Sequence, residues 1–182
     1  AGQLNERESR MSFCREATVK PRTKIVSLQY RPRALICKPH GSLDWYVRAG
    51  RPVFYAGDLP GATRLIITPG QNKFRNGYES PFDLHRTRAN DAIDRAGRYL
   101  ILGYGFNDDH LETHLTPGIK SGKPTLMLTR SLSHTARHRA LSHSNVIALE
   151  YSVVDGIEGT AAIVEKKEFF FPKTGMWDVG LF

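Results

Sequence analysis

His40 is the residue of this chain best suited to proton transfer. It lies in the segment Lys38-Pro39-His40-Gly41-Ser42-Leu43-Asp44-Trp45, directly after the apolar run ALIC at residues 34–37, which we expect to form a buried strand. A His at a strand end, followed by Gly, can offer its imidazole to a ligand, and its ordinary pKa of about 6.5 suits general acid–base catalysis. The alternative interpretation is a His that only occupies a turn.

A second segment, ILGYGFNDDH at residues 101–110, has the pattern of a strand, a glycine-spaced turn and the start of a helix. Glycines at such a turn let the backbone approach a ribose or a phosphate closely. Asp108 and Asp109 oppose a bare pyrophosphate at this helix start. We therefore expect Gly103 and Gly105 to face a ribose or an adenine, unless the glycines serve only the backbone angles of the turn.

Three segments, in this order, resemble the bacterial sirtuin-like family of NAD⁺-depleting anti-phage defence proteins. KPHGSLDW resembles its K-L-H-G-S-x-x-W signature, LIITPGQNKF its strand followed by Pro and a Lys-aromatic pair, and LILGYGFNDDHLETHL its strand, glycine turn and helix. The resemblance implies a cytoplasmic NAD⁺ hydrolase, with a homo-oligomeric state or a defence-system partner protein. It implies His40 as the catalytic residue acting on the nicotinamide ribose, and five NAD⁺-contacting residues: Gly41, Ser42, Gly103, Tyr104 and Gly105.

The chain also departs from the family pattern. No G-A-G-x-S phosphate loop and no T-x-N segment, which supplies the Asn paired with the His, occur in the 182 residues. Pro39 stands where the family has Leu. We therefore expect the C-terminal part of a sirtuin-like domain, with little activity by itself.

The remaining pattern alternates helices and strands. We expect helices at residues 81–96, 108–119 and 133–142, and strands at residues 99–102, 124–129 and 146–149. This order predicts an α/β fold with a doubly wound, mostly parallel, Rossmann-like sheet that is incomplete at its N-terminus. The expected organisation is a polar arm over residues 1–22 and one α/β domain over residues 23–182.

Composition leaves a second class of function open. The formal net charge is +8, and residues 150–182 hold only three Lys/Arg against six Asp/Glu, so the positive charge belongs to the earlier part. A nucleic-acid-binding or nucleotide-sensing module without catalysis is the alternative. Its phosphate contacts would come from two basic groups: Arg22, Lys24, Arg31 and Arg33; and Lys73, Arg75, Arg86 and Arg88.

Metal, disulfide and membrane interpretations are disfavoured. The pairs His110/His114 and His134/His138 have helical spacing but lack the HExxH order, so we expect no metal. The two cysteines, Cys14 and Cys37, are too few for a disulfide scaffold or a four-cysteine zinc module. No apolar run approaches the roughly 20 residues of a membrane span.

Overall fold

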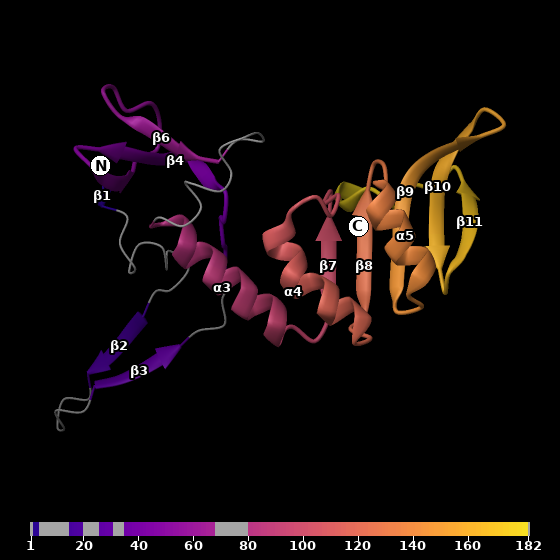
Figure 1. Cartoon of the computed structure of the whole chain (residues 1–182), viewed down its shortest axis with the longest axis horizontal. Coiled ribbons are helices and arrows are strands. Elements are labelled where there is room, and N and C mark those ends of the chain that lie inside the picture. The colour runs from indigo at the N-terminus through magenta and orange to yellow at the C-terminus, as the bar shows by residue number, and fades with distance from the viewer. Residues whose placement is uncertain (1, 4–14, 20–25, 31–34, 68–79, 182) are drawn as a thin grey trace. The chain divides into compact units, whose positions relative to one another are not determined.

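The fold is taken from a computed structural model, which describes residues 2–3, 15–19, 26–30, 35–67 and 80–181. The chain divides into two compact units, Ala1–Ala89 and Asn90–Phe182 (Figure 1). Helix α3 (Phe82–Arg95) begins in the first unit and ends in the second. Each unit is described by itself below.

The first unit is built from antiparallel strands. Its larger sheet has the order β1-β5-β4-β6, formed by β1 (Gly2–Gln3), β5 (Arg51–Phe54), β4 (Gly41–Arg48) and β6 (Thr63–Ile66). A separate hairpin pairs β2 (Arg15–Val19) with β3 (Val26–Tyr30). Trp45 and Tyr46 of β4 are buried, and the start of α3 contributes buried Phe82 and His85. Trp45 contacts both of these rings, so the start of α3 packs on β4.

The second unit contains a mixed sheet of order β11-β10-β9-β8-β7. Strands β7 (Tyr99–Leu102), β8 (Thr125–Thr129) and β9 (Val146–Val154) are parallel. Helix α4 (Asp109–Lys120) joins β7 to β8, and α5 (His134–Ser142) joins β8 to β9. Strands β10 (Ile157–Val164) and β11 (Lys167–Pro172) follow as antiparallel hairpins, and a short 3₁₀ turn, η1 (Val179–Leu181), ends the described chain.

Both crossover helices of the second unit cover the same face of its sheet (Figure 1). The main buried cluster combines side chains from β7, β8 and β9 with Leu115 and Ile119 of α4 and Ala136 and Ala140 of α5. On the other face a smaller cluster forms around Leu128 and Leu149, against which Met176 and Trp177 of the C-terminal segment pack. The helices therefore form one layer only.

The prediction of a doubly wound, mostly parallel sheet is wrong. The described chain is mostly β, with two antiparallel sheets, one of them the β2–β3 hairpin, and one mixed sheet, and the described residues form three α-helices. A right-handed crossover fixes the side of the sheet on which its helix lies. Because β7, β8 and β9 follow one another in a single direction across the sheet, α4 and α5 share a face, and no described helix covers the opposite one. After β9 the chain turns back as hairpins.

Many individual elements are nevertheless confirmed. The helices expected at residues 81–96, 108–119 and 133–142 correspond to α3, α4 and α5, and the strands expected at 99–102, 124–129 and 146–149 to β7, β8 and β9. The strand expected at residues 34–37 is wrong for its described part, because residues 35–37 are not in a strand, and Leu35 and Ile36 are 38% and 65% exposed. None of the helices in the described ranges is long and apolar enough to cross a membrane.

Candidate functional site

The carboxyl ends of the three parallel strands form the candidate site of the second unit. In open α/β sheets, ligands bind outside the carboxyl ends of the strands, at points where the strand order reverses, and the described strands β7, β8 and β9 run in one order without such a reversal. The first turn there follows β7, and Gly103 occupies it with φ +60°, a conformation that favours Gly. A Cβ added at Gly103 would meet no atom within 4 Å, so its Cα faces open space. The open backbone is thus at Gly103, whereas Gly105, also expected to allow close approach, is half-buried and a Cβ there would lie 2.9 Å from the Asn107 side-chain nitrogen.

Aromatic side chains of the turn after β7 pack against one another and stabilise it. Phe106 has a φ of +56°, which strains the backbone of a non-glycine residue, and it is only 3% exposed. Burial of its ring in the core offsets this strain. The Tyr104 ring lies 5.0 Å from the Phe106 ring. The Arg139 guanidinium lies 4.8 Å from the same Phe106 ring. Tyr104 donates its hydroxyl to the Asp108 carbonyl at 3.3 Å. Burial, with a contribution from the charge of Asp108, raises the pKa of Tyr104 to about 12, so its hydroxyl stays protonated.

Ser133 ties the turn to the next strand end. Its Oγ accepts a hydrogen bond from the Ala136 N–H, which caps α5, and donates to the Gly105 carbonyl at 2.6 Å. Beside it, buried Glu150 accepts from the Leu132 N–H at 2.7 Å and pairs with Arg137. The loops after β7 and β8 are therefore held in fixed positions, while the Asn107 side chain stays exposed next to Gly105.

His40 is not at the end of a buried parallel strand, as expected, but in a turn directly before antiparallel strand β4. Its carbonyl accepts a hydrogen bond from the Ile67 N–H at 2.9 Å, and its side chain is exposed. Gly41 follows with φ +83°, and a Cβ there would lie 2.2 Å from the Leu65 carbonyl oxygen. Gly41 therefore has a packing reason of its own, whether or not it contacts a ligand.

The rest of the KPHGSLDW segment forms a local polar network. The Lys38 ammonium donates to Ser42 Oγ at 2.7 Å and lies 3.6 Å from the Asp44 carboxylate. Burial alone would raise the pKa of Asp44, but hydrogen bonding to Ser42 and the charge of Lys38 outweigh it and lower that pKa. Ser42, expected to contact NAD⁺, thus has its hydroxyl bonded to Lys38.

A buried histidine that sequence reasoning missed supports this network from α3. Nδ1 of His85 accepts a hydrogen bond from the Lys38 N–H at 3.1 Å, and its ring lies 4.7 Å from that of Trp45. Burial, together with the nearby charges of Arg88 and Lys38, lowers the pKa of His85, so the ring is neutral at physiological pH. Only the helical pattern of residues 81–96 hinted that one face of this helix would be buried.

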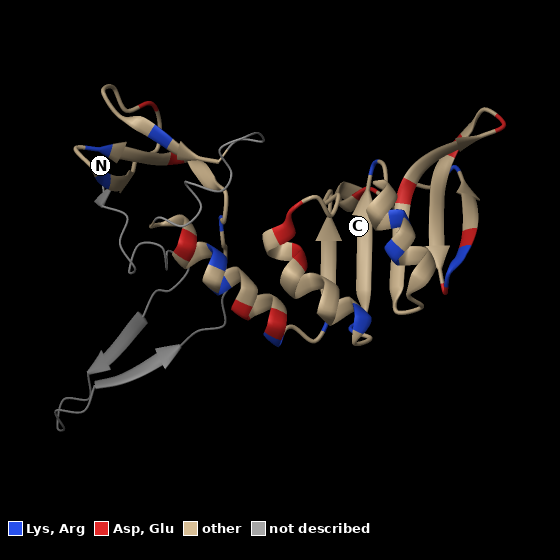
Figure 2. Ribbon diagram, in the orientation of Figure 1, with Lys and Arg blue, Asp and Glu red and all other residues tan. Residues whose placement is uncertain are grey.

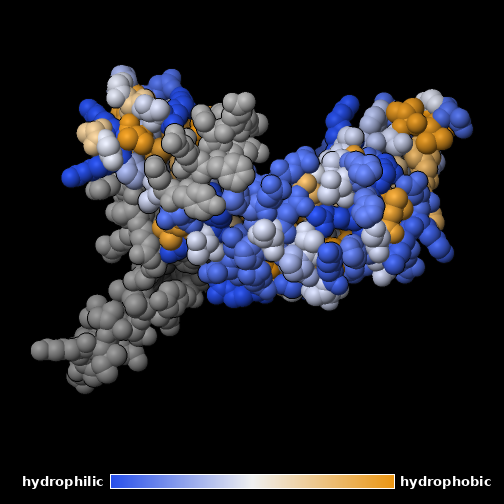
Figure 3. Space-filling model, viewed as in Figure 1, coloured by the Kyte–Doolittle hydropathy of each residue, from blue (hydrophilic) through white to orange (hydrophobic). Residues whose placement is uncertain are grey.

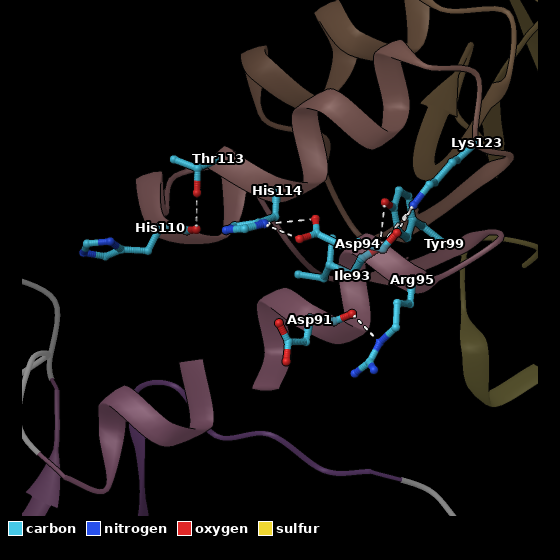
Figure 4. Close-up of polar contacts among 9 residues, drawn as sticks. All are labelled: Asp91, Ile93, Asp94, Arg95, Tyr99, His110, Thr113, His114 and Lys123. Atoms are coloured by element: carbon cyan, nitrogen blue, oxygen red, sulfur yellow. Dashed lines mark hydrogen bonds and ion pairs between the residues drawn. The ribbon is translucent and has the colours of Figure 1, made fainter. Parts of the chain in front are cut away.

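The His110/His114 pair does not converge on a common point. Nδ1 of His114 lies 3.0 Å from both Asp94 carboxylate oxygens, and in Figure 4 the His110 ring extends away from this pair. Within the described ranges, no group of three or more His, Cys, Asp or Glu residues could hold a metal ion. Nearby, the Lys123 ammonium donates to the carbonyls of Ile93 and Asp94, which fastens the end of α3 to the second unit.

The basic residues of the nucleic-acid alternative fall largely outside the described residues, which exclude Arg22, Lys24, Arg31, Arg33, Lys73 and Arg75. Arg86 and Arg88 lie on α3, where acidic and basic side chains are interspersed (Figure 2), so this helix does not present a uniformly basic surface.

The tip of the β9–β10 hairpin is apolar (Figure 3). Its apolar residues are Val153, Val154 and Ile157, each at least 42% exposed.

The structure thus groups the expected residues into two sets. Gly103, Tyr104 and Gly105 share one turn of the second unit, whereas His40, Gly41 and Ser42 belong to the first. No family model matches this chain, and no curated protein matches it.

Proposed function

We propose that the chain binds NAD⁺ at the carboxyl ends of β7 and β8 and belongs to a sirtuin-like NAD⁺ hydrolase. The observation that carries the proposal is the open backbone at Gly103, at the ligand-binding edge of parallel strands. The resemblance of KPHGSLDW and LILGYGFNDDH to the sirtuin-like family supports the same ligand.

Each part of the turn suits the ribose and base of a dinucleotide. Gly103 presents no side chain, so a sugar edge can lie directly against its backbone. Tyr104 keeps its proton at physiological pH, and the exposed Asn107 amide can both donate and accept. Asp108 and Asp109 at the start of α4 keep the pyrophosphate away from this helix.

His40 supplies the catalytic group of the proposal. His40 is an exposed residue of a turn, and its carbonyl accepts a hydrogen bond from the Ile67 N–H. It would deprotonate or position a hydroxyl of the nicotinamide ribose while the glycosidic bond breaks and water replaces nicotinamide. We expect little nicotinamide release from this chain alone, because its sequence holds neither a G-A-G-x-S loop nor a T-x-N segment.

The test is NAD⁺ binding to the full chain, measured by saturation-transfer NMR and calorimetry, for two matched glycine variants. Gly103→Val places a branched side chain into the open space of the turn, and Gly122→Val does so after α4. Both glycines have positive φ and empty surroundings, so the conformational cost is similar. We expect at least a tenfold weaker affinity for Gly103→Val alone. Equal affinities in the two folded variants would refute the site.

A further inference from the structure

Strand β7 forms the outer edge of the second unit's sheet. The Tyr99 N–H donates to the Pro124 carbonyl at 2.8 Å, and the Gly103 N–H to the Leu128 carbonyl at 2.9 Å. Because a parallel ladder bonds alternate residues to each neighbour, Leu100 and Leu102 direct their N–H and C=O groups away from β8. No strand within the described residues pairs with them.

The edge is also apolar. Its sequence YLIL contains no charge and no Pro, two of the features with which proteins protect an edge strand. Leu100 and Leu102 are 60% and 47% exposed. A groove of about 430 Å³ runs beside the strand, and Ala92, Ile93 and Leu111 are among its apolar lining residues. An unpaired strand with such surroundings favours the addition of another strand.

We propose that a second copy of this chain pairs with β7, antiparallel and about a twofold axis at Ile101. In that register Leu100 of one copy lies opposite Leu102 of the other, and each such pair can exchange both N–H···O=C bonds. The four leucine side chains then form one apolar patch on the same face of a continuous sheet. The edge is therefore complementary to itself, as a closed twofold interface requires.

The charge at the edge favours the antiparallel direction for the second copy. Arg98 is the charged residue that lines the groove, and its side chain is exposed. Side-by-side parallel copies would bring the two guanidiniums together, whereas the antiparallel register separates them by about 20 Å along the strands.

The experiment measures the mass of the full chain by sedimentation velocity over a wide concentration range. We compare the wild type with Leu102→Lys and with Leu141→Lys, a matched change at a leucine of α5 that is 38% exposed. We expect a dimer for the wild type and for Leu141→Lys. Leu102→Lys should weaken the dimer about ten- to a hundredfold, because two lysines replace apolar cross-strand contacts. Circular dichroism checks that each variant is folded.

Hydrogen exchange locates the interface independently of the variants. The Leu100 and Leu102 amides should exchange more slowly as protein concentration rises, because they become hydrogen-bonded only in the dimer. A wild type that stays monomeric at all concentrations overturns the proposal. So does a dimer that Leu102→Lys leaves intact, or one that Leu141→Lys disrupts equally.

Discussion

Replacing Gly41 by Ala tests whether this glycine is required by packing. Its φ of +83° disfavours any Cβ by about 1–2 kcal/mol. The added Cβ would also lie 2.2 Å from the Leu65 carbonyl oxygen and 2.8 Å from the Phe82 ring, about 1 Å short of an ordinary C···O contact. Relieving this overlap moves β4 from β6 or displaces Phe82, at the roughly 1–3 kcal/mol typical of overpacking. We expect the unfolding free energy to fall by about 3–4 kcal/mol.

Gly50→Ala is the matched control. Gly50 has φ +71° at the turn between β4 and β5, and a Cβ there would meet no atom within 4 Å. This variant should lose only the conformational term, about 1–2 kcal/mol. Urea unfolding followed by Trp45 fluorescence, in a Trp177→Phe background, reports on the first unit. If Gly41→Ala is no less stable than Gly50→Ala, the packing argument fails and Gly41 is open to a ligand.

Three further predictions concern other residues. In an assembly that turns over NAD⁺, His40→Ala should lower kcat about a hundred- to ten-thousand-fold with little change in NAD⁺ affinity, and unchanged turnover by a folded variant would exclude catalysis by His40. Ser133→Ala should destabilise the second unit by about 0.5–2 kcal/mol and weaken NAD⁺ binding, as calorimetry with a urea titration would show; loss of stability alone would mean that Ser133 only caps α5. Because the pKa of His85 is lowered in the folded state, its neutral form contributes stability above the unfolded pKa of about 6.5, and this contribution is lost as pH falls below it. His85→Gln should flatten the decline in unfolding free energy below that pH, and an unchanged pH profile would contradict the burial argument.

The helices and parallel strands of the second unit were predictable because local signals mark them. Ser133 and Asp108 cap the two crossover helices, and both caps are visible in the sequence. The hairpins were missed although Asp155-Gly156, with φ of +50° and +75°, is a strong hairpin signal between β9 and β10. Without this signal β10 was not expected, and the sheet was predicted to be mostly parallel.

The two sets of expected site residues, one in each unit, differed in how far the sequence could define their surroundings. The turn after β7 depends on neighbouring residues, so its glycines and the following helix could be predicted. The surroundings of Gly41 depend on Leu65 and Phe82, which are distant in the sequence. The run at residues 34–37 was misread because four apolar residues carry no period that separates a strand from an exposed segment.

The single helix layer has an evolutionary consequence for the second unit. Ala136, Ala140 and Ala148 are at most 1% exposed where α5 lies on the sheet, so small side chains set the distance between these layers. Ile147, between two fully buried residues of β9, points to the face that no described helix covers and is 39% exposed. As homologous sequences drift, the three alanines should change slowly and only in concert with their neighbours. The residue type at position 147 should instead vary with the segment that covers that face of the sheet in each homologue.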